Sequence, residues 1–113
     1  MLFRSLNFDL ESRVEGDRAI VTVSGDFDLQ VAQRVVDELA KVEAAEPTLV
    51  ILDLSRLSFL DSAGMGVIAA AQARATEAGR NLAVVRPPYS VRRAFEVSGF
   101  GDVINVVEDI ESI

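Results

Sequence analysis

The sequence predicts a mixed α/β fold: parallel central strands, an N-terminal antiparallel hairpin, and about three to four helices packed on the sheet. Two apolar runs, LVILDL at 49–54 and NLAVV at 81–85, are typical of strands buried on both faces of a sheet. Around them, apolar residues recur every three or four positions, which is the period of an amphipathic helix. Strands that alternate with helices favour parallel pairing through right-handed crossovers.

The N-terminal part predicts a β-hairpin. Its first strand spans Phe3–Glu11, where apolar residues settle into alternation, and its second comprises RAIVTVSG at 18–25. Gly16 and Asp17 form the turn between them. Because strands joined by a tight turn run antiparallel, this hairpin adds an antiparallel edge to the sheet.

Two helices are predicted in the middle of the chain. The first begins at Leu29 and ends near Ala45, where Pro47 prevents its continuation. The second comprises AGMGVIAAAQARATEAG and is closed by Gly79, a residue type that suits a helix C-terminus. Each helix lies between two strands, so both are expected to cross over the sheet.

A third helix and a last strand are predicted in the C-terminal part. SVRRAFEVSGF at 90–100 forms the helix and VINVV at 103–107 the strand. The acidic end at 108–113 is either a short helix or a frayed tail. The order is therefore β-β-α-β-α-β-α-β, and a length of 113 residues suits one domain, 1–113.

The net charge and the composition exclude several classes of partner and location. The net charge of −7 argues against nucleic acid and anionic membranes as partners, because both need clustered cations. No apolar stretch is long enough to cross a bilayer and the N-terminus shows no signal-peptide pattern, so we expect a cytoplasmic protein without membrane insertion. An acidic chain suits basic or mixed protein surfaces, although the charge can equally serve solubility alone.

The stretch FLDSAGMG at 59–66 joins a predicted strand to the second helix and contains Ser62. A nucleophile elbow reads G-x-S-x-G, but here Leu60 replaces the first glycine. The chain has no histidine, and its only lysine, Lys41, is distant in sequence from the motif. A serine needs such a base to become a nucleophile, so we expect no enzymatic activity.

The two glycines of this stretch do not complete a phosphate-binding loop. Gly64-Met65-Gly66 lacks the third glycine of a dinucleotide fingerprint, and no Lys-Ser or Lys-Thr pair follows. The chain also has no cysteine, which excludes thiolate chemistry and disulfides. We therefore expect no cofactor.

Four aspartates, Asp26, Asp28, Asp53 and Asp61, fall near the predicted ends of strands. Carboxylates placed in this way can bind magnesium, as in domains that accept a phosphoryl group on aspartate. Such domains also need a lysine after a late strand, and the corresponding stretch, NLAVVRPP, has none. The alternative is that these carboxylates cap turns or solvate a loop.

Ser62 also has a structural interpretation. A serine or aspartate just before a helix accepts hydrogen bonds from free backbone N–H groups, which contributes about 1 kcal/mol. Either Asp61 or Ser62 can be this cap. The same place lies beside the positive end of the helix, where a phosphate is favourable. Phosphorylation adds roughly −1.5 to −2 charges and can repel a docked partner.

Three stretches, LDLSRLSFLDSAGMGVI, VSGDFDLQVA and PPYSVRRAFEVSGF, together resemble the anti-sigma factor antagonists of the STAS superfamily. The resemblance runs roughly from Val14 to Val107. It implies a STAS-like fold and a protein that binds a partner. In this family the partner is an anti-sigma factor that is also a serine kinase of the histidine-kinase-like ATPase type.

The resemblance further implies a switch at Ser62. The kinase phosphorylates the serine that follows the aspartate, the complex dissociates, and a serine phosphatase can restore binding. The aspartate matching Asp28 lies close to the acceptor in the family, and Asp61 would position Ser62. The residues assigned to partner binding or positioning are Asp26, Asp28, Asp61, Ala63, Gly64, Met65 and Gly66.

Ala63 departs from the pattern of many relatives, which carry serine or threonine after the acceptor. The change leaves Ser62 as the sole hydroxyl of the motif, or it marks a member with another partner. STAS modules also occur in lipid-transport complexes, stress-signalling scaffolds and anion transporters. The alternative function is therefore a STAS subunit of an ABC-type lipid-transport complex or of a signalling scaffold.

Overall fold

The computed structural model describes residues 7–113, and its elements follow the predicted order. The helices and strands are β1 (Phe8–Glu15), β2 (Arg18–Phe27), α1 (Leu29–Glu43), β3 (Leu49–Leu60), α2 (Ser62–Ala78), β4 (Asn81–Val85), α3 (Tyr89–Ser98) and β5 (Asn105–Val107). Two short 3-10 turns are η2 (Phe100–Asp102) and η3 (Ile110–Ser112). Within residues 7–113, no helix is both long and apolar enough to span a membrane.

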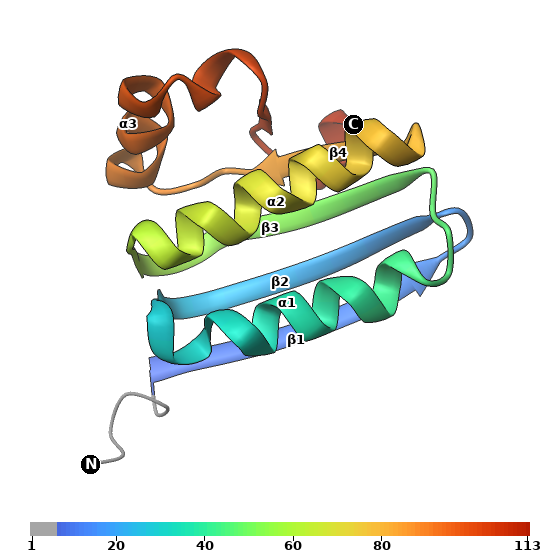
Figure 1. Cartoon of the computed structure of the whole chain (residues 1–113), viewed down its shortest axis with the longest axis horizontal. Coiled ribbons are helices and arrows are strands. Elements are labelled where there is room, and N and C mark those ends of the chain that lie inside the picture. The colour runs from blue at the N-terminus through green and yellow to red at the C-terminus, as the bar shows by residue number, and fades with distance from the viewer. Residues whose placement is uncertain (1–6) are drawn as a thin grey trace.

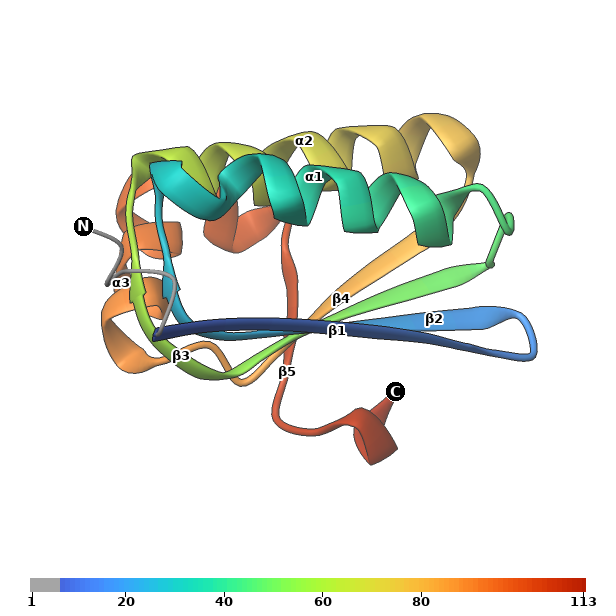
Figure 2. The ribbon, with the colours of Figure 1, turned by 90° about the horizontal axis from the view of Figure 1, so that it is seen from below.

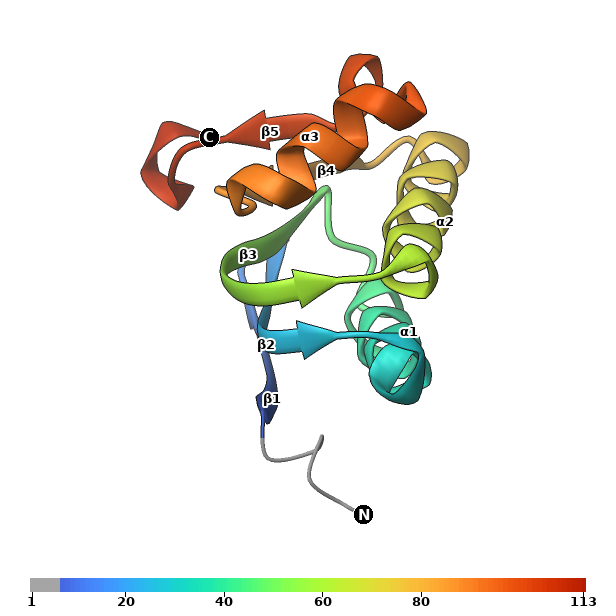
Figure 3. The same ribbon diagram turned by 90° about the vertical axis from the view of Figure 1, so that its left-hand side faces the viewer.

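The strands lie in the sheet in the order β1-β2-β3-β4-β5 (Figure 1). β1 and β2 are antiparallel, and each later pair of neighbours is parallel. Figure 2 shows α1 and α2 side by side on one face of the sheet, while the C-terminal end passes to the other face. In Figure 3, α3 lies next to β4 and β5, at the end of the sheet opposite to β1. The predicted mixed α/β fold class is confirmed.

The main core lies between the sheet and the two crossover helices. Val21, Leu52 and Val84 come from three neighbouring strands, and each is fully buried. They belong to one apolar cluster with Val35 and Leu39 of α1. Burial of each such side chain contributes about 1.5–3 kcal/mol. This cluster explains why α1 carries apolar residues at helical spacing.

The other face of the sheet has a smaller apolar cluster. Ile20, Ile51 and Val85 are almost completely buried there, and Ile110 of the C-terminal turn packs against them. Strands β2, β3 and β4 therefore bury both of their faces, which accounts for their continuous apolar runs.

The N-terminal hairpin forms as predicted, but its first strand ends four residues later than predicted. The strand predicted at Phe3–Glu11 continues to Glu15 in the structure, whereas residues 3–6 lie outside the described residues. Glu15 pairs with Arg18 across the tight turn, so the ladder extends up to Gly16. Gly16 has a φ of 64°, a conformation that glycine adopts without strain.

Strands β2 and β3 are longer than predicted. The parallel ladder continues through two register shifts until Phe27 lies opposite Leu60. The strands predicted to end at Gly25 and Leu54 therefore continue to Phe27 and Leu60. The hydrophobic pattern missed the extension because Ser55, Arg56 and other polar residues interrupt it where the strand is exposed.

The C-terminal elements are shorter than predicted. The third helix ends at Ser98, where Gly99 adopts a φ of 88° and turns the chain into η2. The last strand contains only Asn105–Val107, because the preceding Val103 and Ile104 belong to the turn that follows η2. The end of the chain was predicted as either a short helix or a frayed tail, and in the structure it forms a single 3-10 turn, η3.

Polar side-chain contacts attach α1 to β1 and α2. Ser12 of β1 donates a hydrogen bond to the Glu38 carboxylate. Arg74 of α2 donates two hydrogen bonds to the Glu43 carboxylate, with N···O distances of 2.8 and 2.9 Å. The Ser12 hydroxyl, together with Lys41, lowers the pKa of Glu38, and the bonds to Glu43 raise the pKa of Arg74.

The Ser12 contact predicts a specific dependence of stability on pH. The folded-state pKa of Glu38 lies below its ordinary value of 4.5, so its carboxylate stabilises the fold above pH 4.5. This stabilisation is lost as the pH falls through the folded-state pKa. Ser12→Ala should raise the pKa of Glu38 in an NMR titration, whereas Ser58→Ala, at an exposed strand position, should leave it unchanged. An identical Glu38 titration curve in wild type and Ser12→Ala would contradict this assignment.

Candidate functional site

The carboxylate of Asp61 joins the N-termini of α1 and α2. Its Oδ1 accepts a hydrogen bond from the backbone N–H of Gly64, and its Oδ2 accepts one from the N–H of Leu29, both at 3.0 Å. The N–H of Asp61 donates to the carbonyl of Phe27 at 3.3 Å. One side chain therefore satisfies free donors of two helices and lies at the positive end of both.

Ser62 is the first residue of α2, and its side chain is exposed. The sequence allowed either Asp61 or Ser62 to cap the helix, and the structure assigns the cap to Asp61. Within residues 7–113, the Ser62 hydroxyl makes no side-chain hydrogen bond. The hydroxyl is thus accessible to solvent and makes no hydrogen bond that stabilises the described part of the chain.

Asp28 caps the neighbouring helix α1. Its Oδ1 accepts a hydrogen bond from the N–H of Gln30 at 3.0 Å, and the residue is 6% exposed. Asp26 is half-buried two residues earlier on β2, opposite Phe59 of β3. Asp26, Asp28 and Asp61 therefore lie at the same end of the sheet, where β2 and β3 end.

Asp53 does not belong to this group. Its carboxylate accepts hydrogen bonds from the backbone N–H and the hydroxyl of Ser55, at 3.0 and 2.7 Å. Among residues 7–113, no group of three or more aspartate, glutamate, histidine or cysteine side chains is arranged to hold a metal ion. The carboxylates of Asp28, Asp53 and Asp61 act here as caps of turns and helices, which belongs to one of the two interpretations that the sequence allowed.

The two glycines of the motif have different environments. A Cβ atom on Gly64 would lie 2.5 Å from Cδ1 of Leu60 and 2.9 Å from the carbonyl oxygen of Phe27. A Cβ atom on Gly66 would meet nothing within 4 Å. Gly64 thus allows α2 to start close against β2 and β3, whereas no contact with the described residues 7–113 explains the glycine at position 66.

An apolar groove of about 580 Å³ lies beside Ser62, between the first turns of α2 and the helix α3. Ser62, Met65 and Gly66 line it from α2, and Ala94 and Val97 line it from α3. Val97 is 80% exposed. Contiguous exposed apolar surface of this kind is typical of an interaction site.

The α3 wall of this groove was not predicted from the sequence. A signal was present, because Val91 and Phe95 define the buried side of α3 and Val97 does not fall on that side. Three further large apolar side chains, Leu29, Phe59 and Tyr89, are exposed near the carboxyl ends of parallel strands. The end of the molecule that carries Ser62 therefore displays more apolar surface than the motif alone predicts.

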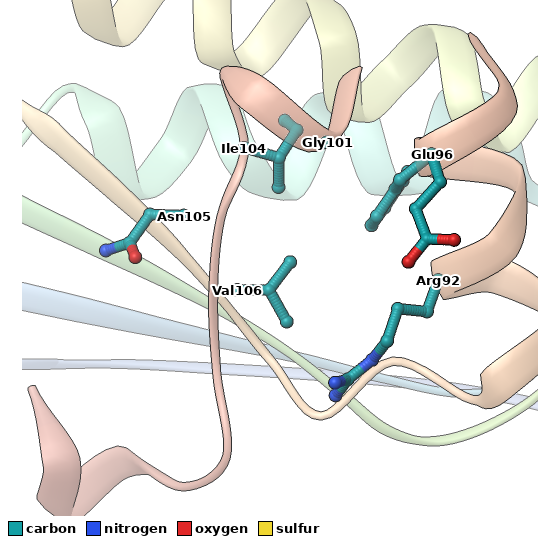
Figure 4. Close-up of a pocket in the computed structure, with 7 residues that line it drawn as sticks. Arg92, Glu96, Gly101, Ile104, Asn105 and Val106 are labelled. Atoms are coloured by element: carbon teal, nitrogen blue, oxygen red, sulfur yellow. The ribbon is translucent and has the colours of Figure 1, made fainter. Parts of the chain in front are cut away.

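A separate pocket of about 390 Å³ lies between α3 and β5 (Figure 4). Ile104 and Val106 line one side, and Arg92 and Glu96 of α3 line the other. Arg92 donates a hydrogen bond to the Glu108 carboxylate at 3.2 Å. None of the residues predicted to form the site lines this pocket.

Comparison with known proteins identifies the family. A family model described as STAS domain matches residues 9–113. The chain belongs to the STAS domain family. This STAS domain is 24% identical over 102 residues to the anti-sigma-B factor antagonist of Listeria monocytogenes. The alignment covers 90% of this chain and 89% of the relative. It is 35% identical over 52 residues to the anti-sigma-F factor antagonist RsfB of Mycobacterium tuberculosis. This second alignment covers 46% of this chain and 43% of the relative.

Solved structures share this fold. The crystal structure of an anti-sigma factor antagonist from Mycobacterium paratuberculosis matches with a TM-score of 0.83 at 22% identity, covering 93% of this chain and 89% of that one. The unphosphorylated form of the anti-sigma factor antagonist SpoIIAA matches with a TM-score of 0.76 at 23% identity, covering 93% of this chain and 91% of that one. The phosphorylated form of SpoIIAA from Bacillus matches with a TM-score of 0.73 at 22% identity, covering 93% of this chain and 95% of that one. The predicted STAS-like fold is confirmed.

The shared cap predicts a large effect of Asp61→Ala. The substitution removes hydrogen bonds from two helix N-termini, so we expect a loss of about 2 kcal/mol in the free energy of unfolding. Urea unfolding measures this change. Asp37→Ala, which removes an exposed carboxylate bonded to Gln33, should change the stability by less than about 0.5 kcal/mol. Equal effects of the two substitutions would show that Asp61 does not hold the two helices.

The two glycines form a matched pair within one helix. Gly64→Ala forces a methyl group against Leu60 and Phe27, so we expect it to destabilise the domain by about 1–3 kcal/mol. Gly66→Ala meets open space and should stabilise it by about 0.5–1 kcal/mol. Thermal unfolding of both variants tests this difference, and a destabilised Gly66→Ala would contradict it.

Proposed function

We propose that this STAS domain is an anti-sigma factor antagonist. In this proposal it binds an anti-sigma factor that is a serine kinase while Ser62 is unphosphorylated, and it releases the kinase after Ser62 is phosphorylated. The observation that carries the proposal is the exposed, unengaged hydroxyl at the start of α2, next to an aspartate that already caps two helices. The names of the relatives that match most of the chain support the same function.

The position of Ser62 suits a residue that is modified. Both Asp61 oxygens accept backbone hydrogen bonds, so this carboxylate is engaged and the kinase supplies the base. The Ser62 oxygen attacks the γ-phosphorus of ATP on the kinase, the new O–P bond forms as the bond to ADP breaks, and the hydroxyl proton passes to that base. The product phosphate lies beside a helix N-terminus, which favours it electrostatically.

Phosphorylation at this place changes the surface without repacking the core. The segment 59–73 contains no lysine or arginine that would neutralise the added charge. The phosphate therefore adds roughly −1.5 to −2 charges directly on the rim of an apolar groove. A partner that fills this groove with apolar side chains would have to desolvate the phosphate, which disfavours the complex.

The groove beside Ser62 is the proposed contact surface for the anti-sigma factor. Met65 and Gly66 contribute from α2, and Val97 contributes from α3. Ala63, half-buried next to Ser62, is proposed as an adjoining contact outside the lining of the groove. The open space above Gly66 allows a partner to approach the α2 backbone closely, which would explain a glycine that costs helix stability.

Asp26, Asp28 and Gly64 are proposed as positioning residues. Asp28 fixes the start of α1, where Leu29 donates its N–H to Asp61. Gly64 lets α2 begin close to the sheet. These contacts set the position of the Ser62 hydroxyl relative to the groove.

The remaining parts of the proposal follow from this role. The domain acts as a cytoplasmic binding protein and not as an enzyme, since Ser62 is the substrate of the kinase and catalyses no reaction. No cofactor is needed, because the kinase binds the ATP. A serine phosphatase would restore the binding form. Residues 1–113 act as a single domain in this proposal.

Variants of Ser62 test the proposed switch. Ser62→Ala should bind the anti-sigma factor as tightly as wild type and should not dissociate when ATP is added. Ser62→Asp should bind at least about tenfold more weakly, because it places a negative charge on the groove rim. Thr76→Asp, at the exposed far end of the same helix, is the matched control and should bind like wild type. Titration calorimetry with the anti-sigma factor in ADP measures the affinities.

Two outcomes would contradict the proposal. In the first, both Ser62 variants bind like wild type and ATP releases neither of them nor the wild type. In the second, pull-down from the native cell recovers a transporter ATPase and no kinase-like ATPase, which would support the role of a subunit in a lipid-transport complex.

A further inference from the structure

Arg80 is a charged residue without a polar partner in the described chain. It follows Gly79, which closes α2, and it precedes β4. Its Nε atom is buried and has no hydrogen-bond partner, and within residues 7–113 its side chain forms no ion pair. Buried donors are almost always satisfied, and an unsatisfied charged donor is costly. The chain holds 18 acidic and 11 basic residues, so a shortage of carboxylates does not explain this.

Capping of the C-terminal end of α2 does not explain the position of the Arg80 guanidinium either. A cation near a helix C-terminus is favourable, and this effect agrees with an arginine at this position. The carbonyls of Ala75 and Thr76, however, already accept hydrogen bonds from the backbone N–H groups of Arg80 and Gly79. The guanidinium is therefore not needed to satisfy these carbonyls.

A pocket of about 440 Å³ opens beside Arg80, where the end of α2 meets the start of β4 and the segment that leads into β5. Thr76, Asn81 and Asn105 line it with a hydroxyl group and two amide groups. Among residues 7–113, no acidic residue lines it. The volume falls in the range of roughly 300–1,000 Å³ that is usual for sites of small molecules.

Two other arginines of the chain show that an unpaired guanidinium is not the rule here. Arg74 is bonded to Glu43 through two nitrogens, and Arg92, in the pocket of Figure 4, is bonded to Glu108. The positive charges of these two arginines are balanced by carboxylates. The pocket beside Arg80 combines a cation with uncharged polar groups, which is the composition that an anion needs.

We propose that this pocket binds a small molecule that carries a carboxylate or phosphate group. The planar guanidinium of Arg80 pairs with the oxygens of that group through parallel N–H bonds. The side chains of Thr76, Asn81 and Asn105 bind the uncharged polar part of the molecule. The pocket lies at the opposite end of α2 from Ser62, about 25 Å away at 1.5 Å per residue, so it is a second site that does not depend on the proposed switch.

An NMR titration of the full chain tests the proposal. Sodium phosphate and sodium succinate are added separately at constant ionic strength, and the Nε–Hε signal of Arg80 and the side-chain amides of Asn81 and Asn105 are followed. We expect saturable shifts for at least one of the two anions, with a Kd below about 10 mM. The two arms distinguish a phosphate ligand from a carboxylate ligand.

Variants decide whether the pocket is responsible. Arg80→Gln should weaken binding at least tenfold, whereas Arg56→Gln, at an exposed position of β3, should leave it unchanged. The amide spectrum of Arg80→Gln reports whether it folds; if it does not fold, Asn105→Ala, at an exposed position, replaces it and should weaken binding at least threefold. Shifts that grow linearly with both anions, or that are equal in wild type and the pocket variant, indicate an adventitious ion only and would overturn the proposal.

Discussion

The site around Ser62 depends on one shared carboxylate. Asp61 bonds to the third residue of its own helix and to the first residue of the neighbouring helix, so α1 and α2 start from a common point. This is possible because β2 and β3 remain parallel neighbours to their last residues, with Phe27 opposite Leu60. Two helices that leave adjacent strands at the same level present their N-terminal N–H groups to the same space.

The exposure of Ser62 follows from this arrangement. Since the preceding aspartate caps α2, the serine occupies the first helical position, and its hydroxyl is left to solvent. Gly64 allows the helix to start close to the sheet, so Ser62 sits on a surface held by strands on one side and by α3 across a groove. In the proposed switch, a phosphate on Ser62 alters the charge and shape at the rim of that groove.

The sequence predicted the features that depend on local pattern. The fold class, the strand NLAVV, the turn at Gly16 and a cap at Asp61 or Ser62 all follow from spacing and residue type. Features that depend on distant contacts were missed. The bond from Leu29 to Asp61 joins residues 32 positions apart, and Val97 becomes part of a groove only when α3 packs beside α2. The extension of β3 was missed because its exposed positions are polar.

The central claim is that Ser62 receives a phosphoryl group from the anti-sigma factor to which the domain binds. Mass spectrometry of the purified domain, after incubation with that protein and ATP, tests this most directly. We expect the addition of one phosphate, located on Ser62 by fragmentation, and the loss of the complex at the same rate. A complex that forms while the mass of the domain stays unchanged, or a phosphate on another residue, would contradict it.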